Sequence, residues 1–501
     1  MKGDPVSSPR PSPQDDASPM NALAAGASLN DGQRRIDHTA LQAQVAALAR
    51  TLRAQGIRVL ATVMDNSPAW VVADLAAAQA GLVHVPLPVF FTPAQMAHAT
   101  RAAGVDGVLT VAPLAALWPQ AAPLPCEVAG QPLALLRLPA TAVPLPAGTA
   151  KITFTSGTTG TPKGVCLSGP AMHRVADGLA QALQPLGITR HLCALPFAVL
   201  LENIAGLMAP LSQGAECVVL PLAEVGLQGS SHFDAARLQA AVERHQPHSL
   251  ILLPQMLRAW AGWLRHHQQR APASLRMVAV GGASVGTALI QAARAVGIPA
   301  HEGYGLSEGA SVQTLNLPGA DRPGSAGRAL PHAQLRLAAD GEIEIRGSLF
   351  AGYLGDPSPV PAWWPSGDLG EIDAEGFVHV RGRKKHVLIT AYGRNVSPEW
   401  VETALRSEGA IAQAVVFGEA QATLSAVLWP MQPAASDAEL QAAVDAANQT
   451  LPDYARVGHW VRAGAAFTVE TGLATANGRP QRQAILAQHA DALAAAACET
   501  P

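Results

Sequence analysis

One stretch of the chain is crowded with groups that can hold phosphate. Residues 153–164 read TFTSGTTGTPKG, with three glycines, a run of Ser and Thr hydroxyls and Lys163, directly after a strand-like run. Backbone N–H groups, hydroxyls and an ammonium within one flexible loop can clamp a polyphosphate. Pro162 and Gly164 flank the lysine, so no Walker loop fits, and the loop lacks the glycine pattern of a dinucleotide fingerprint. The loop predicts a phosphate clamp of another kind; the alternative is a plain Ser/Thr/Gly linker.

Two later segments add the groups that a nucleotide and its metal would need. HEGYGLSEGA, residues 301–310, places Tyr304 between glycines, where its ring can stack on a purine, and Glu308 four residues on. A carboxylate is the kind of oxygen ligand that Mg²⁺ prefers beside phosphates. PSGDLGEID, residues 365–373, presents Asp368 in a Gly-bounded turn, where it can accept both hydroxyls of a ribose. The alternatives are a core aromatic for Tyr304 and an ordinary surface charge for Glu308.

The elements that position these segments alternate between helix and strand. A helical stripe of leucines and Val45 over 41–52 stops at Gly56, and the apolar run at 57–64 predicts a strand. Ser67 before Pro68 predicts a helix start, and Thr92, Pro93 and Gln95 form a capping-box pattern. Repeated strand–helix–strand units of this length predict an α/β fold, a parallel sheet covered by helices.

The alternation of helices and strands gives way to short β segments after about residue 320. Residues 333–347 predict a hairpin turning at Asp340-Gly341, followed by short Gly-rich β segments. A small α+β unit follows the charged stretch RKKH at 383–386. We therefore expect a disordered tail at 1–34, a large domain at 35–383 and a small domain at 384–501.

Composition narrows the class of protein. A chain of 501 residues favours two or more domains. The net charge of −3 disfavours nucleic acid or an acidic membrane as the main partner. The first residues lack the apolar core of a signal peptide, and Gly, Pro and charges interrupt every apolar run. The five cysteines lack metal or disulfide spacing, so we expect no zinc site and a cytoplasmic location.

Six motifs in chain order resemble the adenylate-forming (AMP-binding) superfamily, which includes acyl-CoA synthetases, luciferases and peptide-synthetase adenylation domains. They are TSGTTGTPKG, YGLSEG, GEIEIRG with AGYLGD, SGDLG, GRKKHVLITAYGRNVSPEWVE and TANGRPQR. The resemblance covers about residues 35–485, is closest to long-chain fatty acyl-CoA synthetases, and is specific because of the order of the motifs. It implies parallel sheets packed with helices, a distorted β-barrel and a mobile C-terminal domain.

The resemblance also implies a role for each motif residue. Members join a carboxylate to ATP, releasing pyrophosphate, and then pass the acyl group to a thiol; the implied cofactors are ATP, Mg²⁺ and CoA or a phosphopantetheinyl carrier protein. Ser307 would meet the α-phosphate where the family more often has Thr, Glu308 would hold Mg²⁺, and Tyr304 would stack on adenine. Lys385 would be the hinge and Gly393 would line the thiol tunnel. The implied ATP-binding residues are Thr155, Ser156, Gly157, Thr158, Thr159, Gly160, Lys163, Tyr304, Gly305, Ser307, Asp368 and Arg383.

The last motif departs from the family pattern. TANGRPQR carries Arg479 where the family has its adenylation lysine. Arginine keeps the positive charge but is planar and bulkier, so two outcomes stay open. Either Arg479 bridges the carboxylate and the α-phosphate with altered geometry, or adenylation is weak and the chain is a non-catalytic ATP/acyl-AMP-binding homologue.

The predicted acyl pocket is apolar. LPFAVLLENIAG, residues 195–206, offers Val199 and Leu200 where amino-acid-activating domains usually carry an Asp, and Gly282 is the third expected pocket residue. Burying an ammonium there without a partner would be unfavourable, although Glu202 could pair with one. The favoured activity is a fatty-acid–CoA ligase, and the alternative enzyme is an acyl-AMP ligase that loads an acyl carrier protein.

Overall fold

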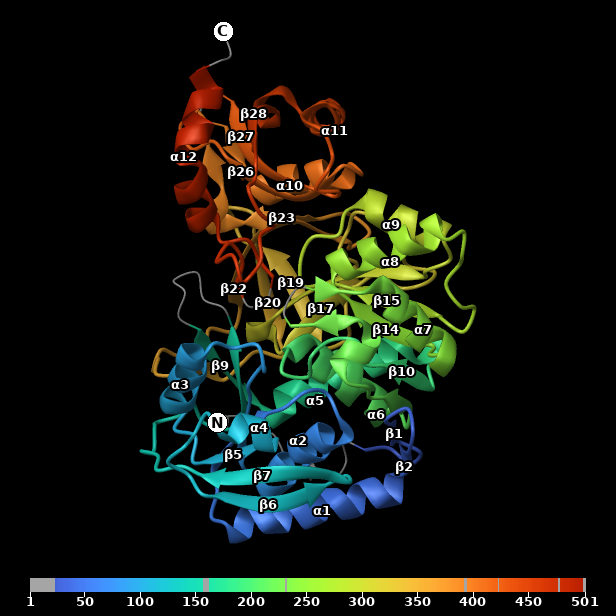
Figure 1. Cartoon of the computed structure of the whole chain (residues 1–501), viewed down its shortest axis with the longest axis vertical. Helices are drawn as coiled ribbons and strands as arrows, with labels where there is room; N and C mark the ends of the chain where they lie inside the picture. Colours follow the sequence, from blue (N-terminus) through green and yellow to red (C-terminus); the bar gives the residue numbers. More distant parts are fainter. Residues whose placement is uncertain are drawn as a thin grey trace, which may run out of the picture.

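The computed structural model describes residues 23–155, 162–229, 232–391, 394–421, 423–475 and 478–498. Two parts are visible in Figure 1: a large body, residues 23–383, and a smaller C-terminal unit, residues 384–498, stacked on one end of it. The body contains two large sheets and one small sheet, and the C-terminal unit has a sheet of its own. The α/β architecture expected from the alternating helices and strands is confirmed.

The first large sheet has eight strands in the order β21-β9-β8-β4-β3-β5-β7-β6. Its centre is parallel, since β3 pairs in parallel with β4 and β5, and β4 with β8, while the outer strands pair antiparallel. The strands are β3 (Val59–Val63), β4 (Val83–Pro86), β5 (Gly107–Thr110), β6 (Pro123–Val128), β7 (Gln131–Arg137), β8 (Thr149–Thr155), β9 (Lys163–Ser168) and β21 (Gly352–Tyr353). The helices between them are α1 (His38–Ala54), α2 (Pro68–Ala80), α3 (Pro93–Ala102) and α4 (Ala112–Ala115).

The second large sheet has nine strands in the order β18-β17-β16-β15-β14-β10-β11-β1-β2. They are β1 (Ser28–Asn30), β2 (Arg35–Ile36), β10 (Arg190–Leu192), β11 (Glu216–Val218), β14 (Ser249–Leu252), β15 (Met277–Val280), β16 (Ala300–Leu306), β17 (Ser311–Leu315) and β18 (Arg328–Ala329). Its helices are α5 (Gly169–Leu183), η2 (Gln184–Leu186), the π-helix η3 (Glu202–Met208), α6 (Ala209–Ser212), η4 (Leu222–Val225), α7 (Ala235–His245), α8 (Pro254–His266), α9 (Thr287–Ala295) and η5 (Ser307–Gly309). A two-stranded ribbon pairs β12 (Leu227–Gln228) with β13 (His232–Phe233).

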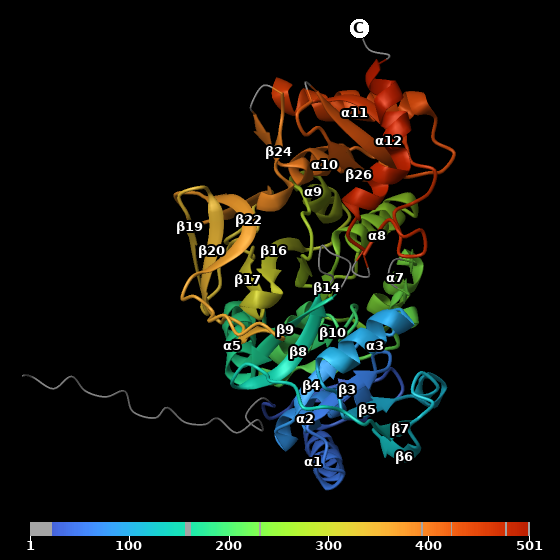
Figure 2. The ribbon, with the colours of Figure 1, turned by 90° about the vertical axis from the view of Figure 1, so that its left-hand side faces the viewer.

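A four-stranded antiparallel sheet lies where the body meets the C-terminal unit (Figure 2). Its strands are β19 (Ala333–Leu337), β20 (Glu342–Gly347), β22 (Trp364–Ile372) and β23 (Val378–Arg383). The β19–β20 hairpin turns at Asp340-Gly341, as predicted, and Gly341 takes the positive φ of 83° that such a turn needs. This sheet carries Asp368 and Arg383, so it brings one side of the predicted nucleotide site to the junction.

The C-terminal unit begins at the short helix η6 (Lys384–His386). The strands are β24 (Leu388–Ile389), β25 (Asn395–Val396), β26 (Ile411–Phe417), β27 (Leu424–Pro430) and β28 (Val457–Arg462), and the last three form one sheet. The helices are α10 (Pro398–Ser407), α11 (Asp437–Gln449), η7 (Asp453–Ala455) and α12 (Arg482–Cys498). β24 has only two residues, because η6 takes up the residues before it.

The local start signals predicted from sequence are confirmed. Ser67 caps α2 by accepting from the N–H of Trp70, with Pro68 at the first helical position. Thr92 and Gln95 form both bonds of a capping box on α3. The predicted leucine stripe of α1 is buried against the body. These signals depend on neighbouring residues alone, which is why the sequence displays them.

Ordered structure starts earlier than the predicted tail boundary at residue 34. β1 pairs in parallel with β11, with Ser28 opposite Glu216 and Asn30 opposite Val218. Leu29 is fully buried in this strand. The segment is too short to show a period, and its strand state depends on a partner almost two hundred residues away. Within the described residues, no helix is long and apolar enough to cross a membrane.

A buried polar network joins the first large sheet and α2 to the helix η3. Lys151 on β8 forms an ion pair with Asp74 on α2, at 2.8 Å, and donates to Asn203 on η3. Asp74 also bonds to His84 on β4, at 2.6 Å, and to the amide of Asn203, at 3.0 Å. Burial alone would raise the pKa of the Asp74 carboxyl, but Lys151 and His84 hold the pKa well below its usual range. The network fixes α2, β4, β8 and η3 relative to one another.

Replacing Lys151 by Met should destabilise the body strongly, because it leaves the buried Asp74 without its cation. We expect a loss of about 3–5 kcal/mol in the free energy of unfolding, measured by urea denaturation. Arg381→Ala is the matched control, since Arg381 pairs with Glu371 at the exposed surface and should change stability by less than about 1 kcal/mol. Equal losses in the two variants would contradict a structural role for the network.

Candidate functional site

Asp368 lies at the centre of the candidate site, on β22. It is 5% exposed and stands opposite Arg383 of β23 in the antiparallel ladder. Arg383 Nε lies 2.9 Å from Asp368 Oδ1, and the Tyr304 hydroxyl donates to Asp368 Oδ2 at 2.8 Å. Burial raises the pKa of Asp368, while Arg383 and the Tyr304 hydroxyl work in the opposite direction. The structure therefore brings together the three side chains expected to bind adenosine.

Glu308 lies in the short helix η5, which directly follows β16, the strand that carries Tyr304. Its Oε1 accepts the hydroxyl of Tyr353 at 2.7 Å, and burial together with Glu308 raises the pKa of that tyrosine. The ammonium of Lys163 stands over the Tyr353 ring, 5.4 Å from its centroid. Tyr353 thus connects the predicted metal ligand to the lysine of the phosphate loop. The sequence predicted no role for Tyr353, and only its place in the AGYLGD motif pointed to this residue.

The phosphate loop starts and ends inside the described residues. Thr155, the last residue of β8, stands opposite Lys163, the first residue of β9, so the two ends of the loop lie side by side. The predicted contacts of Ser156, Gly157, Thr158, Thr159 and Gly160 lie outside the described residues, and so does that of Gly393.

Four cations from both parts of the protein converge on this site. Burial lowers the pKa of Lys385, and Arg383, Arg479 and Lys163 lower it further. Desolvation and then Arg383 lower the pKa of Arg479, while Asp368 and Glu308 favour its charge. The Arg479 side chain itself is exposed to solvent. Mutual repulsion among cations is relieved by an anionic ligand, so the arrangement favours a polyanion.

Arg479 reaches the body from the C-terminal unit. Its Nη2 donates to the carbonyl oxygen of Gly282 at 3.4 Å, across 197 positions of sequence. Gly282 follows β15 with φ at 84°, in the left-handed region that favours glycine. A Cβ there would stand 3.1 Å from Leu253 Cδ2. The predicted acyl-pocket residue and the predicted adenylation residue are therefore neighbours.

The other two predicted acyl-pocket residues lie just before η3. Leu200 is 7% exposed and belongs to the same hydrophobic cluster as Ile204 of η3 and Leu315 of β17. Val199 is partly buried, and its carbonyl accepts the N–H of Asn203 as the helix begins. No contact in the described residues joins them to Gly282, so the common pocket stays a prediction.

The link between the two parts is anchored on both sides of Lys385. Lys384 Nζ lies 2.7 Å from Glu342 and 2.5 Å from Asp340, both in the body. His386 pairs with Glu399 of α10, in the C-terminal unit. Lys385 is therefore the residue between a neighbour fixed to the body and a neighbour fixed to the C-terminal unit.

The sequence predicted no role for Glu302, but in the structure its carboxylate binds the loop that carries Gly282. It lies on β16, two residues before Tyr304, and accepts the N–H of Val285 at 3.1 Å. Val285 belongs to the loop that carries Gly282. Burial raises the pKa of Glu302 to about 7, so about half of these carboxyls keep their proton at pH 7. No spacing pattern in the sequence indicated this environment, because loop and strand meet only in the folded chain.

Comparison with protein families gives two matches in chain order. The AMP-binding enzyme model matches residues 17–354, and the AMP-binding enzyme C-terminal domain model matches residues 385–498. The boundary between the two matches falls beside Lys385.

Curated relatives share parts of this chain. The chain is 36% identical to the long-chain-fatty-acid–CoA ligase FadD15 of Mycobacterium bovis over 159 residues, which are 30% of this chain and 26% of that protein. It is 32% identical to indoleacetate–CoA ligase of Aromatoleum aromaticum over 293 residues, 53% of this chain and 54% of that one. The chain thus spans only about a quarter to a half of these relatives.

Solved structures share the fold over almost the whole chain. The anthranilate CoA ligase AuaEII in complex with anthranoyl-AMP gives a TM-score of 0.78 at 19% identity, covering 96% of this chain and 98% of that one. O-succinylbenzoate coenzyme A synthetase (MenE) from Bacillus subtilis with AMP gives 0.73 at 23% identity, covering 93% and 97%. Both parts of the architecture are included in these alignments.

Replacing Glu302 by Gln should flatten the pH dependence of stability. The folded chain holds the Glu302 proton to a pH of about 7, above the ordinary 4.5, so wild-type stability falls as pH rises across that window. Glutamine can still accept the Val285 N–H but does not titrate. As the pH rises from 4.5 to about 7, we expect the free energy of unfolding of the variant to increase by up to about 3 kcal/mol relative to that of the wild type.

Urea unfolding of both proteins at several pH values between 4.5 and 8 measures this difference, with 4.5 as the ordinary pKa of the carboxyl. Parallel stability curves for the two proteins would show that Glu302 ionises normally in the folded chain.

Proposed function

Because this chain belongs to the AMP-binding enzyme family, whose model matches residues 17–354, we propose that it is an acid–thiol ligase. It activates a carboxylic acid with ATP to an acyl-adenylate, releasing pyrophosphate. It then transfers the acyl group to the thiol of CoA, releasing AMP. Mg²⁺ accompanies ATP as the cofactor.

The observation that carries this proposal is the convergence of four cations around Asp368 and Glu308. Attack of a carboxylate on the α-phosphorus brings one anion towards another, so it needs positive charge arranged in advance. Burial and then Arg383, Arg479 and Lys163 lower the pKa of Lys385, and desolvation and then Arg383 lower that of Arg479. Two of these cations, Lys385 and Arg479, belong to the C-terminal unit, which supports a site completed only when the two parts are docked.

The contacts around Asp368 suit the nucleoside. Asp368 and Arg383 form a rigid pair that can fix the ribose, and Tyr304 presents its ring next to that pair. Glu308 fits Mg²⁺, since its carboxylate offers the oxygen ligand that this ion prefers and lies in the predicted phosphate site. The ion would neutralise phosphate charge. Ser307, in η5 beside Glu308, would donate its hydroxyl to the α-phosphate.

Arg479 is proposed to join the acid to the nucleotide. Its contact with the Gly282 carbonyl supports a position at the mouth of the acyl pocket, and Asp368 and Glu308 act on its charge from the nucleotide side. A planar guanidinium can donate to two oxygens at once, which suits a bridge between a carboxylate and a phosphate. This favours an active enzyme over a non-catalytic ATP/acyl-AMP-binding homologue.

The acid and the acceptor are narrower proposals. Val199 and Leu200 make the expected pocket apolar, which supports an aliphatic or aromatic acid over an amino acid. The names of the relatives include long-chain fatty acid, indoleacetate and 2-succinylbenzoate ligases, so we propose a fatty acid or an arylalkanoic acid. Those relatives are CoA ligases, which favours CoA over an acyl carrier protein as acceptor. We also propose that the enzyme acts in the cytoplasm, where CoA and ATP are available.

ATP–pyrophosphate exchange should be stimulated by at least one acid in a panel of fatty and arylalkanoic acids. Arg479→Ala should reduce that exchange by about a hundredfold or more, as expected when a group that stabilises transition-state charge is removed. Arg479→Lys should retain or increase it, because the ammonium keeps the charge. Arg462→Ala is the matched control, since Arg462 pairs with Asp437 on another side of the C-terminal unit.

No exchange with any acid would refute the enzyme, and undiminished exchange in Arg479→Ala would refute the role of Arg479. Product analysis with CoA and with a phosphopantetheinylated carrier protein then separates the two acceptors.

Replacing Lys385 by Pro should separate the two half-reactions. The family is expected to rotate its C-terminal domain between them, and Lys385 lies between two anchored residues. Proline fixes φ at this point, so rotation is hindered while the docked arrangement remains accessible. Lys385→Ala is the matched control, because it also removes the ammonium but keeps the backbone free. Relative to Lys385→Ala, we expect thioester formation in Lys385→Pro to fall roughly tenfold or more while exchange is the same. Equal rates of both steps in the two variants would contradict the hinge.

A further inference from the structure

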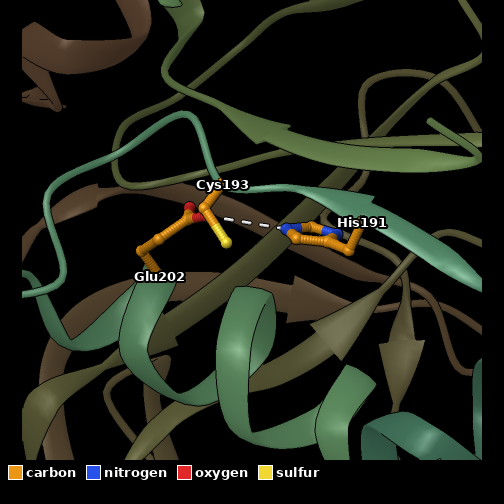
Figure 3. A group of neighbouring side chains, drawn as sticks. All are labelled: His191, Cys193 and Glu202. Carbon is orange, nitrogen blue, oxygen red and sulfur yellow. Dashed lines mark ion pairs between the residues drawn. The ribbon is translucent and has the colours of Figure 1, made fainter. Parts of the chain in front are cut away.

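A second cluster of chemically reactive side chains lies deep in the body, away from the nucleotide site. His191 comes from β10, Cys193 follows that strand, and Glu202 begins the π-helix η3 (Figure 3). All three are buried, and one ligand atom from each lies within 4.8 Å of the other two. Residues 191 and 193 alternate along an extended chain, so both side chains face the helix from one side of the sheet.

Three polar atoms of this cluster lack a hydrogen bond. Glu202 is 0% exposed, and neither carboxylate oxygen has a hydrogen bond among the described residues. His191 Nε2 lies 3.5 Å from Oε1, and it has no hydrogen bond either. Burial raises the pKa of the Glu202 carboxyl, while His191 and the backbone N–H groups of Ala194 and Leu195 work in the opposite direction. A bound cation would stabilise the charged carboxylate further.

The imidazole is already oriented for a ligand. His191 Nδ1 is bonded to the hydroxyl of Ser249, at 2.8 Å, from the neighbouring strand β14. This bond leaves Nε2 to face Glu202 and Cys193. Metal-binding histidines commonly have their second nitrogen held in this way, which fixes the ring orientation.

The helix leaves room beside the two ligand groups. A Cβ at Gly206 would stand 2.5 Å from Glu202 Oε1 and 2.9 Å from His191 Nε2, so only glycine fits there. The Gly206 carbonyl faces two thiols, at 3.6 Å from Cys193 Sγ and 3.9 Å from Cys217 Sγ. Cys217 lies on β11, opposite His191.

We propose that His191 Nε2, Cys193 Sγ and the Glu202 carboxylate bind one Zn²⁺ ion. Nitrogen, sulfur and oxygen ligands at about 2.0–2.3 Å from zinc stand about 3.3–3.8 Å apart in a tetrahedron. The 3.5 Å between His191 and Glu202 falls in that range. The Cys193 thiolate and the Glu202 carboxylate balance the two positive charges, so the buried complex is neutral overall.

The zinc has a structural role, because the cluster is closed to solvent. It fixes the start of η3 against β10, directly after Val199 and Leu200. This site does not depend on the proposed ligase activity.

The metal content of the full-length chain tests the proposal. Protein expressed without a metal-binding tag and dialysed against metal-free buffer should retain about one zinc per chain, measured by inductively coupled plasma mass spectrometry. Apo-protein reloaded with Co²⁺ should show a thiolate-to-cobalt charge-transfer band. Cys193→Ser and Glu202→Gln should lower zinc retention at least roughly tenfold. Cys166→Ser, a buried cysteine on β9 outside the cluster, should retain zinc like wild type.

Two outcomes would overturn the proposal. The first is a wild-type chain that holds no zinc, takes up none when Zn²⁺ is added, and gives no thiolate band with Co²⁺; this result needs no variant to fold. The second is equal zinc retention in Cys193→Ser and Cys166→Ser.

Discussion

Burial and the neighbouring charges of Arg383, Arg479 and Lys163 lower the pKa of Lys385, and this crowding of positive charge is the constraint that the candidate site must satisfy. Like charges gathered in partly desolvated surroundings disfavour the folded state unless something offsets them. Asp368 and Glu308 offset part of the charge, and Arg383 is held to Asp368 at 2.9 Å. In the proposed function, a nucleoside triphosphate with its metal ion would supply the remaining negative charge. ATP binding and docking of the C-terminal unit would then reinforce each other.

The fold gathers these charges from segments far apart in the chain. The body supplies Lys163 from one large sheet, Tyr304 and Glu308 from the end of the other, and Asp368 with Arg383 from the small sheet. The buried network around Asp74 holds η3 against the first large sheet. Arg479 belongs to the C-terminal unit, and Lys385 lies between Lys384, which pairs with the body, and His386, which pairs with the C-terminal unit.

Local signals allowed much of this to be predicted from sequence. The caps at Ser67 and Thr92, the turn at Gly341 and the ordered motifs depend on a few adjacent residues. What could not be predicted depends on tertiary contacts: β1, the bond between Tyr353 and Glu308, and the raised pKa of Glu302. The zinc proposal is the clearest case, because cysteine spacing argued against a metal, and its ligands meet only when η3 covers β10. The roles of the phosphate-loop residues 156–160 and of Gly393 remain sequence predictions.

Calorimetric titration of the wild-type chain with Mg²⁺–ATP, at low and at high ionic strength, tests the central claim most directly. If the four cations form one phosphate site, ATP should bind at about one site per chain, and added salt should weaken binding because it screens those charges. Adenosine, which lacks phosphates, should bind far more weakly and with little dependence on salt. ATP that binds no better than adenosine, or with the same affinity at both salt concentrations, would contradict the account.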